Sequence, residues 1–240
     1  MPKEILGKIH SIQTMGALDG PGIRFVAFTQ GCPLRCKCCH NPDTWDFDGG
    51  QEFSADSLLT RAVRYREYFG KDGGVTVSGG EPLLQAEFVT EFFRKCKENK
   101  LNTCLDTSGC VLNDKVKKLL EVTDRVLLDI KYVTDDAYLD NVGCSITAPM
   151  TFLKYLNEKN ILTTIRQVII PTVNDQVESV LALKKIAKSH PCVDKIELLP
   201  FKKFCSTKYE DMGIPFPFIN ILEPTLEQMT SLEKLIEEYL

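Results

Sequence analysis

Four cysteines and a histidine lie within nine consecutive residues near the start of the chain: Cys32, Cys36, Cys38, Cys39 and His40. Thiolates and imidazoles bind transition metals readily, and thiolates also carry out redox exchange. The other six of the ten cysteines are scattered singly along the 240 residues. This distribution favours a metal or redox site in the dense segment over a framework of disulfides.

Three kinds of site compete for the cysteine segment. A structural zinc site needs four ligands, usually two C-x2-4-C pairs, and the sequence has no second pair downstream. A redox dithiol would use Cys36 and Cys39 and would leave Cys32 without a role. A [4Fe–4S] cluster would use Cys32, Cys36 and Cys39, spaced C-x3-C-x2-C, as ligands of three irons. The fourth iron would stay open for a substrate or cofactor, and the spacing favours this third interpretation.

The elements that must position this segment are short apolar runs alternating with amphipathic stretches. The predicted strands are 23–29, 75–78, 103–106, 125–130, 162–170 and 195–199. The predicted helices are 55–69, 84–98, 114–122, 150–158, 177–189 and 226–240, and three of them have an N-cap residue, namely Ser54, Asn113 and Thr225. Six β–α units in order predict an α/β fold with a parallel sheet, in one domain over residues 1–240.

Unusual polar residues and glycines follow or close most of these strands. In parallel α/β folds the ligand site lies beyond the carboxyl ends of the strands. We therefore expect one shared, enzyme-like site, to which the cysteine segment also belongs because it follows the first strand. The residues concerned are Gly79, Gly80, Glu81, Asp106, Thr107, Asp129, Lys131, Arg166 and Lys202.

The overall composition excludes several classes of partner. The formal net charge is −4 and the pI about 5.5, so we expect no nucleic-acid partner. No stretch approaches the roughly 18 apolar residues that a membrane span needs, and the first residues show no secretory signal. We therefore expect a cytoplasmic protein.

The spacing of Cys32, Cys36 and Cys39 resembles the signature of the radical S-adenosylmethionine (SAM) superfamily. Longer stretches from about residue 7 to residue 200 resemble the pyruvate formate-lyase activating enzymes, in the same order along the chain. These stretches are DGPGIRF (19–25), QGC (30–32), CHNPDTW (39–45), VTVSGGEPLLQ (75–85), CLDTSG (104–109), LDIK (128–131) and IELLP (196–200).

The resemblance implies a partial (β/α)6 TIM-like barrel and a particular chemistry. SAM would chelate the open iron of the [4Fe–4S] cluster, and the reduced cluster would split it into methionine and an adenosyl radical. The radical would remove one Cα hydrogen from a backbone glycine of a partner protein, most simply pyruvate formate-lyase. The partner could also be another glycyl-radical enzyme, and the substrate could instead be a small molecule. In a different class, a zinc-holding module that docks a partner stays open.

The resemblance also assigns roles to individual residues. Gly79, Gly80 and Glu81 would bind the ammonium end of SAM, although the same segment could simply be a strand-to-helix turn. Asp129, Ile130 and Lys131 would belong to the SAM site, as would Cys38 and His40. A monovalent cation could lie beside SAM on Asp106, Thr107 and Asp129. Asp19 and Arg166 would face the incoming glycine loop, but an arginine in an apolar strand could equally form an internal salt bridge.

The sequence departs from the family pattern near the cofactors. Cys38 stands where an aromatic residue usually packs on the SAM adenine, and Lys202 stands where a histidine is frequent. No cysteine-rich ferredoxin-like insertion lies between residues 46 and 74. This absence favours the formate-lyase type of activase and predicts an external flavodoxin or ferredoxin as electron donor. We expect a monomer.

Overall fold

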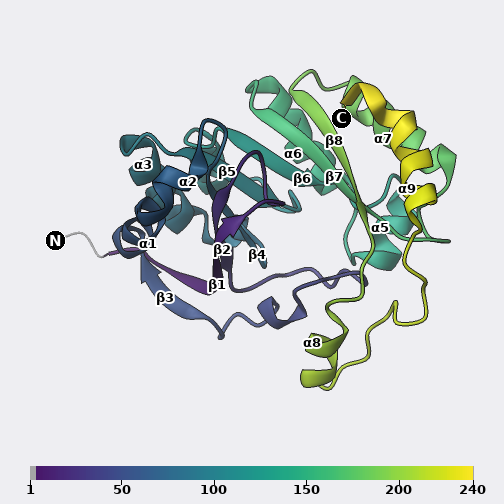
Figure 1. The fold of residues 1–240 in the computed structure, drawn as a ribbon, viewed down its shortest axis with the longest axis horizontal. Coiled ribbons are helices and arrows are strands. Elements are labelled where there is room, and N and C mark those ends of the chain that lie inside the picture. Colours follow the sequence, from purple (N-terminus) through teal and green to yellow (C-terminus); the bar gives the residue numbers. More distant parts are fainter. Residues whose placement is uncertain (1–3, 240) are drawn as a thin grey trace. The chain divides into compact units, whose positions relative to one another are not determined.

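A computed structural model describes residues 4–239 of the chain (Figure 1). The strands are β1 (Leu6–Gly16), β2 (Arg24–Thr29), β3 (Gln51–Ser54), β4 (Gly74–Gly79), β5 (Asn102–Thr107), β6 (Arg125–Asp129), β7 (Leu162–Ile169) and β8 (Val193–Pro200). The α-helices are α1 (Ala55–Ala62), α2 (Arg66–Phe69), α3 (Ala86–Glu98), α4 (Asp114–Leu120), α5 (Asp135–Asn141), α6 (Thr147–Glu158), α7 (Val177–Lys188), α8 (Ser206–Asp211) and α9 (Leu226–Glu233). Short 3-10 helices are η1 (Pro42–Thr44), η2 (Val63–Tyr65), η3 (Pro82–Gln85) and η4 (Lys234–Tyr239).

The strands pair in the order β3-β1-β2-β4-β5-β6-β7-β8, an eight-stranded sheet whose order has two ends and is not closed. The pairs β2–β4, β4–β5 and β7–β8 are parallel, as the alternation of strands and helices predicts. Five of the six residues of β2 and of β4 are buried, which is typical of strands covered on both faces. The α/β fold with a partial TIM-like barrel is thereby confirmed.

The sequence prediction missed β1 and β3, which pair antiparallel with each other and extend the sheet beyond β2. The apolar residues Ile9, Ile12 and Met15 of β1 recur every three residues, whereas a half-buried strand repeats every two. The pairing of β1 with β2 changes register between Ile9 and Ser11 and again between Gln13 and Gly16. Such irregularities shift the alternation of faces, so the sequence pattern does not show the strand.

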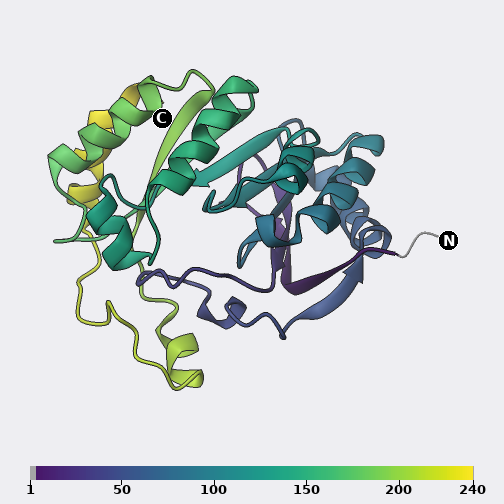
Figure 2. The same cartoon turned by 180° about the vertical axis from the view of Figure 1, so that it is seen from behind.

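The described chain divides into two compact units. Unit 1 holds the residues up to Pro33 together with Thr44–Leu127, and unit 2 holds Leu34–Asp43 together with the chain from Leu128 onward. In unit 1, α1 and α4 both pack on α3, and in unit 2, α7 and α9 contact β8 (Figure 1). The reverse view shows the same helices from behind (Figure 2). The single domain over residues 1–240 stays a prediction.

Most predicted helices are present, with the expected N-caps. The side chains of Ser54, Asn113 and Thr225 each accept a hydrogen bond from the first turn of α1, α4 and α9. The stretch 55–69 is wrong as one helix, because the 3-10 turn η2 separates α1 from α2. The prediction also missed α5 and α8, both under eight residues long and therefore weak in periodicity. The last predicted helix is divided into α9 and η4, and its final residue, Leu240, lies outside the described residues.

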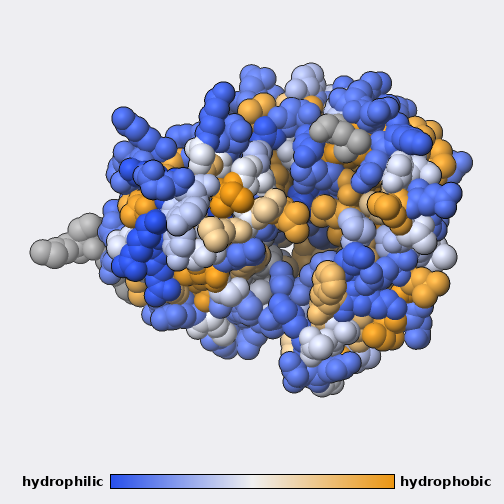
Figure 3. Space-filling model, viewed as in Figure 1, coloured by the Kyte–Doolittle hydropathy of each residue, from blue (hydrophilic) through white to orange (hydrophobic). Residues whose placement is uncertain are grey.

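Polar and charged residues cover much of the face shown in Figure 3, with apolar residues in scattered groups. Among residues 4–239, no helix combines the length and the apolar character that crossing a membrane would require.

Arg24, the first residue of β2, organises the interior of unit 1 at the amino ends of the strands. Its side chain is fully buried and donates to Thr76 Oγ1 (2.6 Å), Val75 O (2.8 Å) and Asn102 Oδ1 (2.9 Å). It also donates to Pro21 O (3.0 Å). One guanidinium thus satisfies acceptors from the loop before β2 and from β4 and β5.

We expect Arg24→Met to lower the free energy of unfolding by about 3 kcal/mol or more, because several buried acceptors lose a charged donor. Urea titration followed by circular dichroism measures this change. Arg94→Met on the exposed face of α3 is the matched control and should cost less than about 0.5 kcal/mol. Equal stability of the two variants would show that Arg24 does not hold these strands together.

Candidate active site

In unit 1, the start of the cysteine segment is held by backbone hydrogen bonds. Gly31 N donates to Thr44 O (2.8 Å) and Cys32 N to Trp45 O (3.3 Å). From the other side, Glu81 N donates to Gly31 O (2.9 Å). The backbone around Cys32 is therefore fixed by the segment after β4, by the last residue of η1 and by the residue after it.

The two glycines after β4 are required by this close backbone approach. A Cβ added at Gly80 would lie 2.3 Å from Gly31 O, and one at Gly79 would lie 2.2 Å from Thr29 N. Gly79 also has a φ of +112°, a conformation that favours glycine. The pattern Gly-Gly-Glu thus has a structural cause in the packing of one loop on another, and a role of these glycines toward SAM stays a prediction.

The carboxylate of Glu81 is buried and fully engaged within unit 1. It accepts hydrogen bonds from Leu83 N (3.1 Å), Thr107 Oγ1 (2.6 Å) and Ser108 N (3.0 Å), and also from the hydroxyl of Ser108. Burial raises the pKa of Glu81, and the hydrogen bonds from Ser108, Thr107 and Leu83 oppose that rise. All four acceptor positions of this carboxylate are thus occupied by groups of unit 1, and its role toward the SAM ammonium stays a prediction.

The neighbouring strand β5 ends in two predicted cation ligands. Asp106 Oδ2 accepts from Ser78 Oγ (2.8 Å), and Thr107 donates to Glu81 as described. The predicted residues Asp106, Thr107 and Glu81 are thus brought together, and Ser78 and Ser108 join them. Both serines lie within the stretches that resemble the family, but the sequence assigned neither of them a role.

Asp19 lies elsewhere in unit 1. It is in the loop between β1 and β2, and its backbone carbonyl accepts from Thr76 Oγ1 (2.7 Å) near the amino end of β4. Glu81, by contrast, follows the carboxyl end of β4. Within unit 1, Asp19 and Glu81 are therefore associated with opposite ends of the same strand, and the substrate role of Asp19 stays a prediction.

In unit 2, the rest of the cysteine segment packs on the C-terminal end of α5. Lys37 N donates to Asn141 O (2.9 Å) and Arg35 N to Val142 O (3.4 Å). Lys37 Nζ also lies 3.0 Å from Asp140 Oδ2. Cys36, which stands between Arg35 and Lys37 in the chain, is buried. Its carbonyl accepts a hydrogen bond from Cys39 N (3.0 Å).

The predicted residues Asp129 and Lys131 meet beside these thiols. Their side chains form an ion pair of 2.7 Å, in agreement with the prediction that alternate residues at a strand end point to one face. Burial would lower the pKa of Lys131, but Asp129, Cys36 and Cys38 raise it well above its ordinary value. Lys131 therefore keeps a positive charge next to two cysteines of the segment.

Cys38 is buried, as is Cys36, whereas Cys32 and Cys39 are partly exposed. Burial raises the pKa of the Cys38 thiol to about 12, and Cys36 and Cys39 add to the rise. The choice of Cys32, Cys36 and Cys39 as cluster ligands, without Cys38, stays a prediction from their spacing.

The chain after β8 holds the end of the cysteine segment. His40 Nε2 donates to Lys202 O (3.0 Å), Tyr209 OH donates to Cys39 O (3.2 Å), and Lys208 Nζ contacts Asn41 Oδ1 (2.9 Å) and the Asp43 carboxylate (3.0 Å). Desolvation lowers the pKa of His40, although part of the residue stays in solvent. Sequence reasoning missed this support because it comes from α8, which carried no clear pattern.

Lys202 and Arg166 are both ion-paired within unit 2. Lys202 Nζ lies 2.8 Å from Glu223 Oε2, so only its backbone carbonyl meets His40. Arg166 Nε lies 3.5 Å from Glu197 Oε2 on the adjacent strand β8. This pair is an internal salt bridge, which was one of the two alternatives for Arg166 in the sequence analysis. A role of Arg166 toward substrate stays a prediction.

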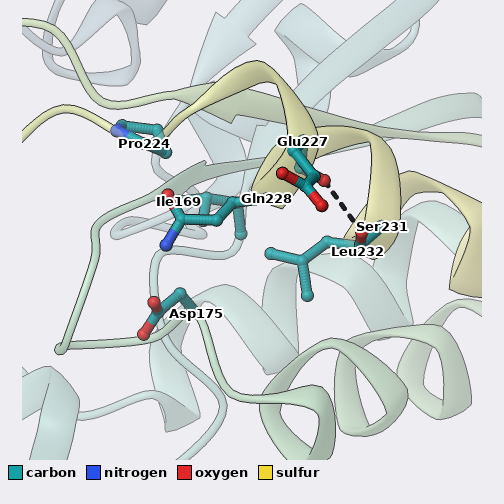
Figure 4. A pocket seen from close by; sticks show the side chains of 7 residues that line it. All are labelled: Ile169, Asp175, Pro224, Glu227, Gln228, Ser231 and Leu232. Carbon is teal, nitrogen blue, oxygen red and sulfur yellow. Dashed lines mark hydrogen bonds between the residues drawn. The ribbon is translucent and has the colours of Figure 1, made fainter.

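A cavity of about 310 Å³ lies near the carboxyl end of β7 in unit 2. Figure 4 shows its lining, with the Ser231 hydroxyl donating to the backbone carbonyl of Glu227. None of the predicted site residues lines it, and nothing in its chemistry connects it with the cysteine segment. Its lining residues are Ile169, Asp175, Pro224, Glu227, Gln228, Ser231 and Leu232.

Residues 26–183 match the family model of the radical SAM superfamily, which covers more than half of the chain. The chain therefore belongs to this superfamily, whose members use a [4Fe–4S] cluster and SAM. Within the superfamily it belongs to the pyruvate formate-lyase activating enzymes, because curated members of that family match almost its whole length.

Two of these relatives illustrate the similarity. The pyruvate formate-lyase 1-activating enzyme of Escherichia coli is 42% identical over 238 residues, covering 98% of this chain and 97% of its own. The pyruvate formate-lyase-activating enzyme of Clostridium pasteurianum is 43% identical over 237 residues, covering 98% and 99%. Among solved structures, SuiB of Streptococcus suis bound to S-adenosylmethionine has a TM-score of 0.69 at 14% identity, covering 88% of this chain and 45% of that one. This last likeness shows the fold alone.

The residues of the cysteine segment fit a cluster of this kind. Three cysteines at the family spacing would supply thiolates, and the partly buried Lys131 lies near Cys36, where it would balance negative charge. The hydroxyl of Tyr132, which is buried nearby, has no partner among the described residues and is free to donate. The donor set thus suits an iron–sulfur cluster, and the roles of Glu81 and Lys131 toward SAM stay predictions.

We expect Lys208→Met to loosen the residues around Asn41 and Asp43, because both lose their contact with the ammonium group of Lys208. Hydrogen exchange of the backbone amides in this stretch should become about tenfold faster. Mass spectrometry of peptic fragments measures the rate. Lys185→Met on the exposed face of α7 is the matched control and should leave the rate unchanged. An equal, slow exchange in both variants would show that α8 does not restrain the segment.

Proposed function

We propose that this chain is an activase that removes a hydrogen atom from the Cα of a backbone glycine in pyruvate formate-lyase and leaves a glycyl radical. The observation that carries the proposal is the 42% identity to a pyruvate formate-lyase activating enzyme over 98% of the chain. When bound, the [4Fe–4S] cluster and SAM supply the one-electron cleavage that yields the hydrogen-abstracting species.

The proposed cluster ligands are Cys32, Cys36 and Cys39. The backbone hydrogen bonds at Gly31 and Cys32 support this assignment, as do those at Arg35, Lys37 and Cys39, because they hold the loop in one conformation without using the thiols. A loop held in this way presents its thiolates to a cluster at little cost in conformational entropy.

The proposed SAM residues carry opposite charges. Glu81 would bind the ammonium group, beside Gly79 and Gly80, and Lys131 would bind the carboxylate or ribose region, beside Asp129 and Ile130. The burial of Glu81 and of the Lys131 side chain supports these roles, since charged hydrogen bonds are stronger away from water. Cys38 and His40 complete the set, and a monovalent cation on Asp106, Thr107 and Asp129 is part of the same proposal.

The proposed substrate contacts are Asp19 and Arg166, and the proposed electron donor is an external flavodoxin or ferredoxin. The chain would act as a monomer that docks the glycine loop of its partner. Exclusion of water from the reacting glycine is the main task of the protein in such chemistry, because a carbon radical must not meet other hydrogen donors.

Anaerobic reconstitution tests this function directly. The purified protein should bind iron and sulfide in a ratio of about 4:4 and release 5′-deoxyadenosine from SAM with a reductant. Mixing it with pyruvate formate-lyase should produce the doublet of a glycyl radical in electron paramagnetic resonance. A protein that cleaves SAM without this doublet would act on another substrate, and one that binds only zinc would contradict the whole proposal.

We expect Cys32→Ala, Cys36→Ala and Cys39→Ala each to abolish the cluster signal and SAM cleavage, because each removes the ligand of one iron. Cys38→Ala is the matched control in the same loop and should retain both, since Cys38 lies outside the C-x3-C-x2-C spacing. Cluster content and 5′-deoxyadenosine release are measured for all four variants. Loss of the cluster in Cys38→Ala alone would mean that a different set of three thiols binds it.

We expect Arg166→Ala to cleave SAM at a rate within about twofold of the wild type but to form glycyl radical at least about tenfold more slowly, because a charged hydrogen bond to substrate is lost. Lys195→Ala is the matched control, since Lys195 also pairs with Glu197 (2.8 Å). It should preserve both activities. Equal losses in the two activities of Arg166→Ala would remove its substrate role.

A further inference from the structure

The buried hydroxyl of Tyr132 stands out among the polar groups of the described residues. Tyr132 is 2% exposed, and its hydroxyl has no hydrogen-bond partner among the described residues. Buried hydroxyls nearly always have a partner, and leaving one without costs free energy. The position of this hydroxyl therefore needs an explanation.

The neighbouring Tyr138 is a useful comparison, because its buried hydroxyl does have hydrogen-bond partners. The two rings pack edge to face, with centroids 6.1 Å apart, and Tyr138 is equally buried. Tyr138 OH accepts a hydrogen bond from Lys131 N (3.0 Å) and donates toward Asp129 O (3.4 Å). Tyr132 has the same chemistry and the same burial, but its hydroxyl does not share this backbone site.

Tyr132 lies beside the cysteine segment in unit 2. It follows Asp129 and Lys131 along the chain, and it packs on Tyr138 of α5, the helix whose end binds Arg35 N and Lys37 N. Burial raises the pKa of Tyr132, and Cys38 and Cys36 raise it further, which places both thiols within electrostatic range of the phenol. The hydroxyl thus stays protonated and remains a donor next to the cysteine loop.

We propose that the Tyr132 hydroxyl donates a hydrogen bond to a sulfur atom of the [4Fe–4S] cluster on the side held by Cys36. This inference rests on the proposed function, because it assumes a cluster on Cys32, Cys36 and Cys39. A donor to cluster sulfur stabilises the reduced form, which carries one more negative charge than the oxidised form, and so raises the reduction potential. Tyr132 would make the cluster easier to reduce by an external donor.

Tyr132→Phe removes the hydroxyl and keeps the ring. The experiment is a redox titration of the reconstituted protein, with dithionite as one-electron reductant and electron paramagnetic resonance as readout, in the absence of SAM. At a fixed potential we expect the ratio of reduced to oxidised cluster to fall at least threefold in the variant. The potential does not depend on turnover, so a merely structural role of the ring would not change it.

The stability of the cluster-free protein gives a second, independent readout. Because Tyr132 OH makes no hydrogen bond within the described protein, Tyr132→Phe should leave the midpoint of urea unfolding unchanged or raise it. Tyr138→Phe is the matched control, and it should lower the midpoint because Lys131 N loses its acceptor. A fall in the midpoint for Tyr132→Phe equal to that for Tyr138→Phe would show that the hydroxyl has a structural partner and would contradict the inference.

The outcomes separate this inference from the proposed function. A wild-type protein that assembles no cluster would contradict both. A cluster that assembles in wild type and variant with equal potentials would contradict the inference alone. A shift that appears only after SAM is added would also contradict it, since the hydroxyl would then bind SAM and not the cluster.

Discussion

The cysteine segment has almost no regular secondary structure, so its conformation depends on partners for its own backbone groups. Up to Cys32 those partners are Glu81 N, Thr44 O and Trp45 O in unit 1. From Arg35 onward they are the last residues of α5 and the hydroxyl of Tyr209 in unit 2. In each unit, the backbone groups of this loop are therefore held by the neighbouring chain and not by a helix or strand of their own.

The need to hold the backbone of this loop accounts for the residue types at several neighbouring positions. Gly80 must lack a side chain because Gly31 O lies where its Cβ would be. Tyr209 and Lys208 both form hydrogen bonds with the end of the cysteine segment. The ring of Tyr209 packs on Phe216, with centroids 4.8 Å apart, and this packing holds the Tyr209 hydroxyl in place. The chain after β8 is therefore part of the loop's support as much as the sheet is.

The charges of the site are buried where they act most strongly. Glu81 is held by four donors within unit 1, and Lys131 is held by Asp129 beside Cys36 and Cys38 in unit 2. The two departures from the family pattern also find a physical setting here. Cys38 is a buried thiol whose pKa is raised by burial, and Lys202 forms an ion pair with Glu223 while its carbonyl accepts from His40.

The sequence alone indicated the family and six of the eight strands of the sheet, and it predicted the site residues, because these depend on local motifs and on the order of apolar runs. It also predicted that Asp129 and Lys131 share a face, since side chains alternate along a strand. Only the tertiary structure decided what β1, α5 and α8 contribute and how Arg166, Lys202 and Tyr132 are placed. The physical reason is that the partners of these side chains, such as Glu197, Glu223 and Tyr138, reach them through tertiary packing. Such contacts cannot be inferred from the local pattern of apolar and polar residues.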